Sequence, residues 1–187
     1  MEIEVKVPVP ALEPVRSRAR ALGYVLGVER HLEANLLLDY PDRSLGAAGC
    51  LLRVRETPRG GLLTFKGRPV SHDTYKVRPE HETWCEDAAA VRAVLHAIGL
   101  RPVFRYEKYR EQYEAPGAHL CLDELPFGVF LELEGSPEGI EALAAALELD
   151  RAAFTKRSYA DLYAEHCRAL GRPFGDILFE RGTDGNP

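Results

Sequence analysis

The sequence predicts an α+β fold, an antiparallel eight-stranded β-barrel with a charged interior and amphipathic helices packed against its outside. Three observations support this prediction. Eight segments alternate apolar and charged residues with a period of two, as half-buried strands do. Four other segments carry apolar residues at three- and four-residue steps, which line one face of a helix. The length of 187 residues suits a single domain, which we expect over residues 1–170, followed by a loosely structured tail over residues 171–187.

The first half of the chain is expected to contain one helix among five strands. A strand over residues 2–8 is followed by a helix over residues 10–22, which Gly23 ends. Further strands are expected over residues 35–40, 51–56, 62–67 and 74–84. Pro58-Arg59-Gly60-Gly61 is typical of a turn between two of them. Pro79 cannot donate to a strand ladder and therefore indicates an edge or a bulge.

The second half is expected to contain three helices and three strands. Gly99 ends a helix over residues 87–98, and strands follow over residues 104–114, 119–124 and 128–134. Ser136 followed by Pro137 is a typical start for a helix over residues 136–147. Ser158, with Asp161 three residues later, predicts the start of a fourth helix.

Charged residues share one face of seven of these strands, and apolar residues share the other. In the first strand, Glu2, Glu4 and Lys6 alternate with Ile3 and Val5. The charged positions of the other six strands are Arg53, Arg55, Lys66, Lys76, Arg78, Glu80, Glu82, Lys108, Arg110, Asp123, Glu132 and Glu134. The apolar faces of the strands must be buried, and the helices can pack against them from outside. The charged faces would then line the interior of a barrel or a deep trough.

A mixed interior of this kind suits a ligand that needs both signs of charge. Lysines and arginines would bind phosphate oxygens, while carboxylates would hold Mg²⁺ or Mn²⁺ bridging to the same phosphates. Solvent-facing sheets with cross-strand ion pairs are the alternative, and for one strand alone they are the simpler interpretation. Across seven strands that interpretation weakens, because a solvent face would also contain Ser, Thr, Gln and Asn.

The composition excludes several classes of protein. A net charge of −5 argues against a protein that coats nucleic acid or an anionic membrane. No apolar run approaches the roughly 20 residues of a membrane helix, and charge begins at residue 2, so we expect a cytoplasmic protein without nucleic-acid or membrane partners. The four cysteines are far apart and predict neither a zinc site nor disulfides. A homodimer would be consistent with the sequence.

Several motifs together resemble the CYTH superfamily of triphosphate tunnel enzymes. This group includes class IV adenylyl cyclases, thiamine triphosphatases and inorganic tripolyphosphatases. The resemblance covers residues 1–165 and begins with Glu2-x-Glu4-x-Lys6. The other matching segments are Leu52-Arg53-Val54-Arg55, Leu63-Thr64-Phe65-Lys66-Gly67, residues 76–82, Glu107-Lys108-Tyr109-Arg110, residues 122–134 and Ser158-Tyr159.

The resemblance implies roles for the charged residues. Divalent metal ions, Mg²⁺ or Mn²⁺, would be held by Glu2, Glu4, Asp123, Glu132 and Glu134. The triphosphate of a small-molecule substrate would be bound by Lys6, Arg53, Arg55, Lys66, Lys76, Arg78, Lys108 and Arg110. Glu2, Glu4 and Lys6 are the candidate catalytic residues. Glu80 and Glu82 could contact metal-bound water or orient neighbouring cations, and the sequence does not decide between these roles.

Three functions are compatible with these residues. A triphosphatase needs only water as the nucleophile and is favoured for that reason. A class IV adenylyl cyclase, which converts ATP to cyclic AMP and pyrophosphate, would also need a pocket for adenine, and no base-recognition motif is legible. A non-catalytic sensor of polyphosphate or nucleotide would not need the metal-binding carboxylates, all of which are present, and it ranks lowest.

Overall fold

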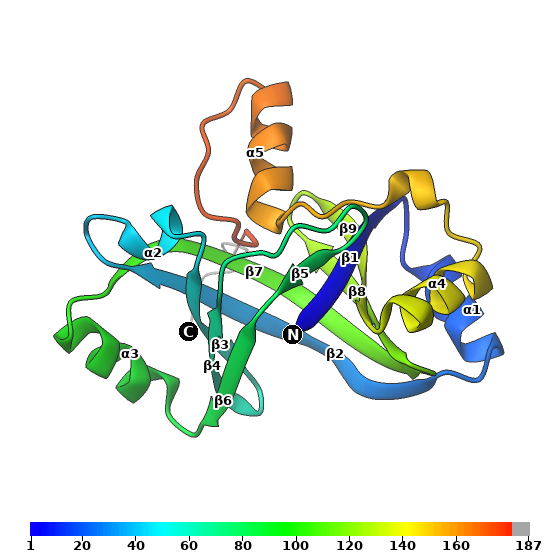
Figure 1. The fold of residues 1–187 in the computed structure, drawn as a ribbon, viewed down its shortest axis with the longest axis horizontal. Coiled ribbons are helices and arrows are strands. Elements are labelled where there is room, and N and C mark those ends of the chain that lie inside the picture. Colours follow the sequence, from blue (N-terminus) through cyan, green and yellow to red (C-terminus); the bar gives the residue numbers. More distant parts are fainter. Residues whose placement is uncertain (181–187) are drawn as a thin grey trace, which may run out of the picture.

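The computed structural model describes residues 1–180, which form nine strands and five α-helices (Figure 1). The strands are β1 (Glu2–Val9), β2 (Val25–Asp39), β3 (Leu51–Thr57), β4 (Gly60–Lys66), β5 (Lys76–Arg78), β6 (Glu80–Cys85), β7 (Arg101–Ala115), β8 (Ala118–Leu125) and β9 (Gly128–Gly135). The helices are α1 (Glu13–Ala21), α2 (Ser44–Ala47), α3 (Ala88–Ala97), α4 (Pro137–Ala146) and α5 (Tyr159–Ala169), with a 3₁₀ turn over Arg151–Ala153. The predicted α+β class is confirmed.

The strands form one antiparallel sheet whose two edges are adjacent in the chain. Their order is β5-β1-β9-β8-β7-β2-β3-β4-β6. The edge strands β5 and β6 are separated only by Pro79, while β5 pairs with β1 and β6 pairs with β4. The chain therefore ties the two edges of the sheet together, and the sheet curls into the nearly closed barrel that the sequence predicts.

Pro79 also explains why there are nine strands where the sequence predicts eight. The predicted strand over residues 74–84 is divided at this residue, because proline has no N–H to donate to a ladder. The Pro79 carbonyl oxygen accepts a hydrogen bond from the backbone N–H of Gly67 at 2.8 Å. The predicted edge at Pro79 is therefore the point at which the two sheet edges meet.

The main hydrophobic core lies outside the barrel wall, between the sheet and the helices α1 and α4. Val5 of β1 is the cross-strand partner of Leu133 of β9, and both pack in one cluster with Ile140 of α4. All three side chains are fully buried, which stabilises the fold by about 1.5–3 kcal/mol for each. Because successive strand residues point to opposite faces, this outward packing of Val5 turns Glu4 and Lys6 into the barrel.

All four predicted helices are present, and the structure adds a short one. α3 packs against β3 and β4, and α5 stands at the upper end of the barrel in Figure 1. The added helix is α2, where the Asp39 carboxylate accepts hydrogen bonds from the backbone N–H groups of Leu45 and Gly46 at 3.0 and 2.9 Å. Within residues 1–180, none of the helices is long and apolar enough to cross a membrane.

Strand β2 begins at Val25, well before the predicted start at residue 35. Its pairing with β7 shifts register between Leu26 and Val28 and again between Val28 and His31. Such bulges interrupt the period-two pattern, which is why the sequence does not reveal this part of the strand. The longer strand brings His31 and Glu33 into the barrel wall.

The C-terminal segment is better packed than the sequence predicts over residues 171–180. Ile177 is 1% exposed and forms a parallel bridge with Tyr106 of β7. Asp176 pairs with Arg105 at 2.7 Å, and the ring of Phe174 stacks on Phe104. These contacts fill the side of β7 that β8 does not reach, since β8 pairs only from Tyr109 onward. The rest of the predicted tail, residues 181–187, lies outside the described residues.

Gly139, in the first turn of α4, sets how closely that helix approaches the turn between β7 and β8. A Cβ at Gly139 would press on the backbone of Gly117, closer to its carbonyl oxygen than real Cβ atoms come. We expect Gly139→Ala to lower the free energy of unfolding by about 1–3 kcal/mol, as overpacking does, in a urea titration. Gly175→Ala is the control, because a Cβ there would meet nothing within 4 Å. Equal losses in both variants would show that close packing at Gly139 is not the cause.

Candidate active site

The interior of the barrel contains a cavity of about 330 Å³. Its lining includes every residue proposed for the site from the sequence except two. These lining residues are Glu2, Glu4, Lys6, Arg53, Arg55, Lys66, Lys76, Glu80, Glu82, Lys108, Arg110, Glu132 and Glu134. Residues from seven strands, β1, β3, β4, β5, β6, β7 and β9, thus converge on one space. The predicted charged interior therefore exists as a single site.

Arg78 and Asp123 are the two predicted residues that do not line the cavity. The Arg78 guanidinium donates to the backbone carbonyls of Gly67, Gly49 and Lys66 at 2.8, 3.0 and 3.1 Å. Asp123 has no exposed surface and accepts hydrogen bonds from Lys108, Arg110 and the Tyr159 hydroxyl. Arg78 therefore holds two loops in place, and Asp123 orients cations from behind the cavity wall.

One side of the cavity is built from lysines that lie between carboxylates. Lys6 Nζ is 2.9 Å from Glu4 Oε1 and 3.0 Å from Glu132 Oε2. Lys76 Nζ is also 2.9 Å from Glu4 Oε1. Burial opposes ionisation of Glu4, but Lys6 and Lys76 outweigh it and lower the pKa of Glu4 to about 2. Glu4 is therefore an ionised partner for two lysines.

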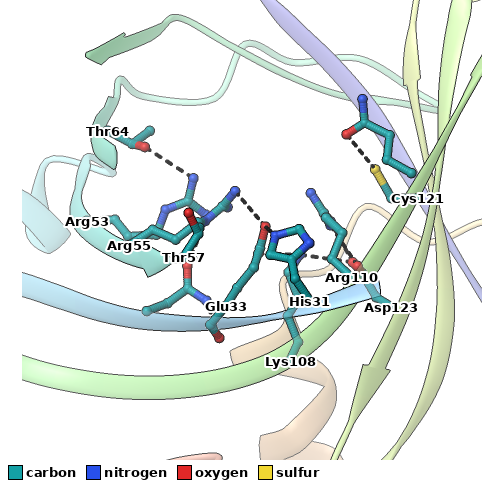
Figure 2. A network of polar contacts seen from close by, with 12 residues as sticks. His31, Glu33, Arg53, Arg55, Thr57, Thr64, Lys108, Arg110, Cys121 and Asp123 are labelled. Atoms are coloured by element: carbon teal, nitrogen blue, oxygen red, sulfur yellow. Dashed lines mark hydrogen bonds and ion pairs between the residues drawn. The ribbon is translucent and has the colours of Figure 1, made fainter. Parts of the chain in front are cut away.

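Two arginines of β3 and two cations of β7 also line the cavity (Figure 2). Arg55 donates to the Glu33 carboxylate at 3.1 Å and to Asn35 at 3.0 Å. Arg53 donates to the Thr64 hydroxyl at 3.2 Å and to the Tyr106 hydroxyl at 3.1 Å. These pairings hold the guanidinium groups at the cavity wall, in position for an anion.

The structure adds two site residues that the sequence does not single out, Glu33 and Tyr106, which both line the cavity. His31 and Tyr159, the latter from the Ser158-Tyr159 segment of the resemblance, also line it. Tyr106 lies two residues before Lys108, so the period-two alternation of its predicted strand could have placed it inside. The sequence gives no such signal for Glu33, because the bulges at the start of β2 interrupt the period-two pattern of its strand.

Three carboxylates gather where the arrangement suits a divalent cation. Glu2, Glu80 and Glu134 each offer an oxygen, and these oxygens lie within 4.8 Å of one another. Glu2 Oε2 is buried without a hydrogen-bond partner among the described residues. A hard cation such as Mg²⁺ or Mn²⁺ takes oxygen ligands of this type and would satisfy that atom. Glu80, whose role the sequence leaves open, thus joins Glu2 and Glu134, and Lys66 Nζ lies 2.5 Å from Glu2 Oε1 and 3.1 Å from Glu80 Oε1. Glu4 and Glu132 lie outside this group and pair with Lys6.

The electrostatics of this group also fit a cation. Burial raises the pKa of Glu80 to about 7, and Glu2 and Glu82 add to the rise while Lys66 opposes it. Burial, together with Glu132 and Glu2, also raises the pKa of Glu134. Carboxylates that repel one another in a low-dielectric site favour protonation until a cation neutralises them.

These shifts predict that Mg²⁺ stabilises the protein more at pH 8 than at pH 6. A raised folded pKa means that the folded protein binds more protons than the unfolded chain between about pH 4.5 and 7, so the stability of the metal-free protein falls as pH rises through that range. Metal binding requires the deprotonated carboxylates and therefore strengthens over the same range. Thermal melts with and without Mg²⁺ should differ by a few degrees more at pH 8. An equal Mg²⁺ effect at both pH values, or an unchanged difference in Glu80→Gln, would contradict the assignment.

Comparisons with known proteins agree with this geometry. The family model of the CYTH domain matches residues 1–159. Among solved structures, a candidate adenylate cyclase of Vibrio parahaemolyticus is similar, with a TM-score of 0.78 and 24% identity over 87% of this chain and 97% of the other. The PH1819 protein of Pyrococcus horikoshii OT3 has a TM-score of 0.70 and 25% identity over 89% of this chain and 99% of its own.

A third solved structure carries a stated activity. It is HpAC1 from Hippeastrum, a candidate adenylyl cyclase described as having a dominant triphosphatase activity. Its TM-score is 0.64, with 20% identity over 92% of this chain and 97% of the other. A search among curated proteins gave no significant match. The family model covers most of the chain, and the chain belongs to the CYTH domain family, whose members are metal-dependent enzymes that process triphosphates.

Proposed function

We propose that this protein is a divalent-metal-dependent triphosphatase that releases orthophosphate from the end of a small-molecule triphosphate. The observation that carries the proposal is the convergence, in one cavity, of three carboxylates suited to a metal ion and eight lysines and arginines. The eight cations are Lys6, Arg53, Arg55, Arg59, Lys66, Lys76, Lys108 and Arg110. Within this proposal the protein acts in the cytoplasm, without a nucleic-acid or membrane partner.

The size and chemistry of the cavity favour a chain of phosphates over a larger molecule. Its volume of about 330 Å³ is at the lower end of the roughly 300–1,000 Å³ typical of ligand pockets. Such pockets are usually apolar with a few polar groups, whereas this one is lined largely by ionised side chains. Inorganic tripolyphosphate and the triphosphate ends of thiamine triphosphate or nucleotides share the charge that such a lining would bind.

Different residues of the chain would bind different phosphates of the substrate. Arg53 and Arg55 would bind non-bridging phosphate oxygens as planar forks. Lys66, whose Nζ lies 3.1 Å from Glu80 Oε1, would bind the phosphate nearest the three carboxylates of Glu2, Glu80 and Glu134. When bound, a divalent ion supplies Lewis acidity at that terminal phosphate. Cations fixed at the cavity wall would stabilise the charge that develops as the phosphorus–oxygen bond breaks.

A class IV adenylyl cyclase is the second candidate, and one observation favours it. Trp84 and Phe104 are apolar aromatic residues in the lining of the same cavity, and Trp84 is 58% exposed. An exposed ring can stack on a nucleobase, so the cavity could receive adenine at one end. Cyclisation would then require the ribose 3′-hydroxyl to reach the α-phosphate, which needs a precise pose of the whole nucleotide.

Product analysis separates these functions. The protein is incubated with tripolyphosphate, thiamine triphosphate or ATP, each with Mg²⁺ or Mn²⁺, and the products are resolved by anion-exchange chromatography. We expect orthophosphate and a chain shortened by one phosphate. Cyclic AMP with pyrophosphate would establish the cyclase instead. Tight metal-dependent binding without turnover of any substrate would indicate a sensor and would refute the proposed activity.

A further inference from the structure

Tyr106 is held at the cavity wall with its hydroxyl among cations. It lies on β7 and lines the cavity, two residues before Lys108. Its phenol oxygen accepts a hydrogen bond from Arg53 Nη1 at 3.1 Å, which fixes the position of the hydroxyl. The ring stacks beside that of Phe104, with ring centroids 6.1 Å apart, and the backbone at Tyr106 is fixed by the bridge to Ile177.

The Tyr106 hydroxyl differs from those of the three buried tyrosines, Tyr75, Tyr113 and Tyr159, which each donate to a carboxylate. Tyr113 donates to Glu111 at 2.6 Å, Tyr159 donates to Asp123 at 2.6 Å, and Tyr75 donates to Glu141. Among residues 1–180, Tyr106 accepts from Arg53 but has no acceptor for its own proton. Its proton is therefore available to an anion in the cavity.

The charged groups that face Tyr106 come from the elements packed around it. Arg53 and Arg55 lie on β3, Lys108 on β7 and Glu33 on β2, and the neutral Tyr159 lies on α5. Ile177, in the C-terminal segment, is uncharged. Burial opposes ionisation of the phenol, but Arg53, Lys108 and Arg55 outweigh it and lower the pKa of Tyr106 to about 8. The hydroxyl is thus a stronger acid than ordinary tyrosine while remaining mostly protonated at pH 7.

The arrangement of the cavity determines which oxygen this proton would meet. Lys66 lies beside the carboxylate group of Glu2 and Glu80, where the terminal phosphate would bind. Arg53 and Arg55 lie one and two cross-strand rows farther along the barrel, where Arg53 is 3.5 Å from Glu82 and Arg55 is 3.1 Å from Glu33. There they would bind the two phosphates that leave together as pyrophosphate or as a diphosphate ester. The hydroxyl of Tyr106, bonded to Arg53, belongs to this second group.

We propose that Tyr106 is a catalytic residue, the proton donor to the oxygen that leaves when the terminal phosphate is hydrolysed. The inference rests on the proposed triphosphatase function. Water forms a new bond to the terminal phosphorus, and the bond from that phosphorus to the bridging oxygen breaks. The bridging oxygen keeps the electron pair and takes the proton of Tyr106. The phenolate is stabilised by Arg53 and recovers a proton released from the attacking water, through solvent, so atoms and charge balance.

Tyr106→Phe tests this role by its pH profile. Wild-type kcat/KM should fall as pH rises above about 8, because the phenol loses the proton that it must donate. In Tyr106→Phe, kcat at pH 7 should fall by about 100-fold, the lower end of the effect of general acid catalysis, and the descending limb near pH 8 should disappear. KM should change much less than kcat. Tyr113→Phe is the matched control, since its hydroxyl donates to Glu111 away from the cavity, and it should keep the wild-type profile.

A second variant keeps the test decisive if Tyr106→Phe has too little activity for a pH profile. A fluorinated tyrosine placed at position 106 keeps the ring and hydroxyl but lowers the phenol pKa, so the descending limb should move to lower pH. A limb that is unchanged in the fluorinated variant, or retained in Tyr106→Phe, would overturn the role of Tyr106. Absence of orthophosphate release by the wild-type protein would instead refute the proposed function itself.

Discussion

Replacing Glu134 by glutamine is expected to reduce kcat for orthophosphate release by about 10³-fold while leaving the fold intact. Glu134 supplies one of the three carboxylate oxygens that lie within 4.8 Å of one another. Glutamine keeps the shape but removes the charge that binds the cation. A bound metal contributes several kcal/mol of transition-state stabilisation, and each 1.36 kcal/mol corresponds to a factor of ten. The loss should be accompanied by weaker Mg²⁺ binding in calorimetry.

The stability of the metal-free variant distinguishes this effect from misfolding. Burial, Glu132 and Glu2 raise the pKa of Glu134, so its ionised form is unfavourable in the folded protein. Glu134→Gln should therefore unfold at the same urea concentration as the wild type at pH 8, or at a higher one. Glu124→Gln is the control, because that carboxylate lies outside the cavity and pairs with the exposed Arg30. Full activity of Glu134→Gln at limiting Mg²⁺ would remove Glu134 from the metal site.

Asp123→Asn is expected to cause the largest loss of stability among single substitutions around the barrel. Asp123 is fully buried, and its carboxylate is 3.0 Å from Lys108 Nζ and 2.5 Å from Arg110 Nη2. It also accepts a hydrogen bond from the Tyr159 hydroxyl. Neutralising it leaves two buried cations without their main counterion, which typically costs about 3–5 kcal/mol. Urea unfolding at pH 7 measures the loss.

An exposed ion pair provides the matched control. Glu148 pairs with Arg18 at 2.6 Å, and its side chain is 73% exposed, so Glu148→Gln should change the free energy of unfolding by no more than about 1 kcal/mol. Tripolyphosphate should restore part of the stability of Asp123→Asn, because it supplies negative charge to the same lysine and arginine. A loss for Asp123→Asn as small as that for Glu148→Gln would show that Glu33 and Glu132, the other partners of Lys108 and Arg110, compensate these cations.

The sequence predicts the orientation of the charged residues because that information is local. In β1, the alternation of Ile3 and Val5 with Glu2, Glu4 and Lys6 assigns the two faces without knowledge of any partner strand. The helices were predictable for the same reason, since Gly23 and Ser136 mark their ends within a few residues. Each of these signals needs only the neighbouring residues.

The remaining features depend on contacts between distant segments. Glu33 lies inside only because β2 pairs with β7 through two bulges. The sequence has no period-two pattern that would predict these bulges. Glu80 joins Glu2 and Glu134 because the break at Pro79 places β6 beside β4 while β5 pairs with β1. Asp123 has the same strand parity as the lining residues, yet the curvature of the barrel buries it behind Lys108 and Arg110. The catalytic and binding roles of the charged residues stay predictions.

We propose that the charged barrel, which would hold a divalent metal ion at Glu2, Glu80 and Glu134, hydrolyses the terminal phosphate of a triphosphate. Hydrolysis of tripolyphosphate in water enriched in oxygen-18 tests this most directly, with products analysed by mass spectrometry. We predict Mg²⁺-dependent release of orthophosphate that carries one labelled oxygen, together with unlabelled pyrophosphate. Label in pyrophosphate, or no orthophosphate release that depends on Mg²⁺ or Mn²⁺, would contradict it.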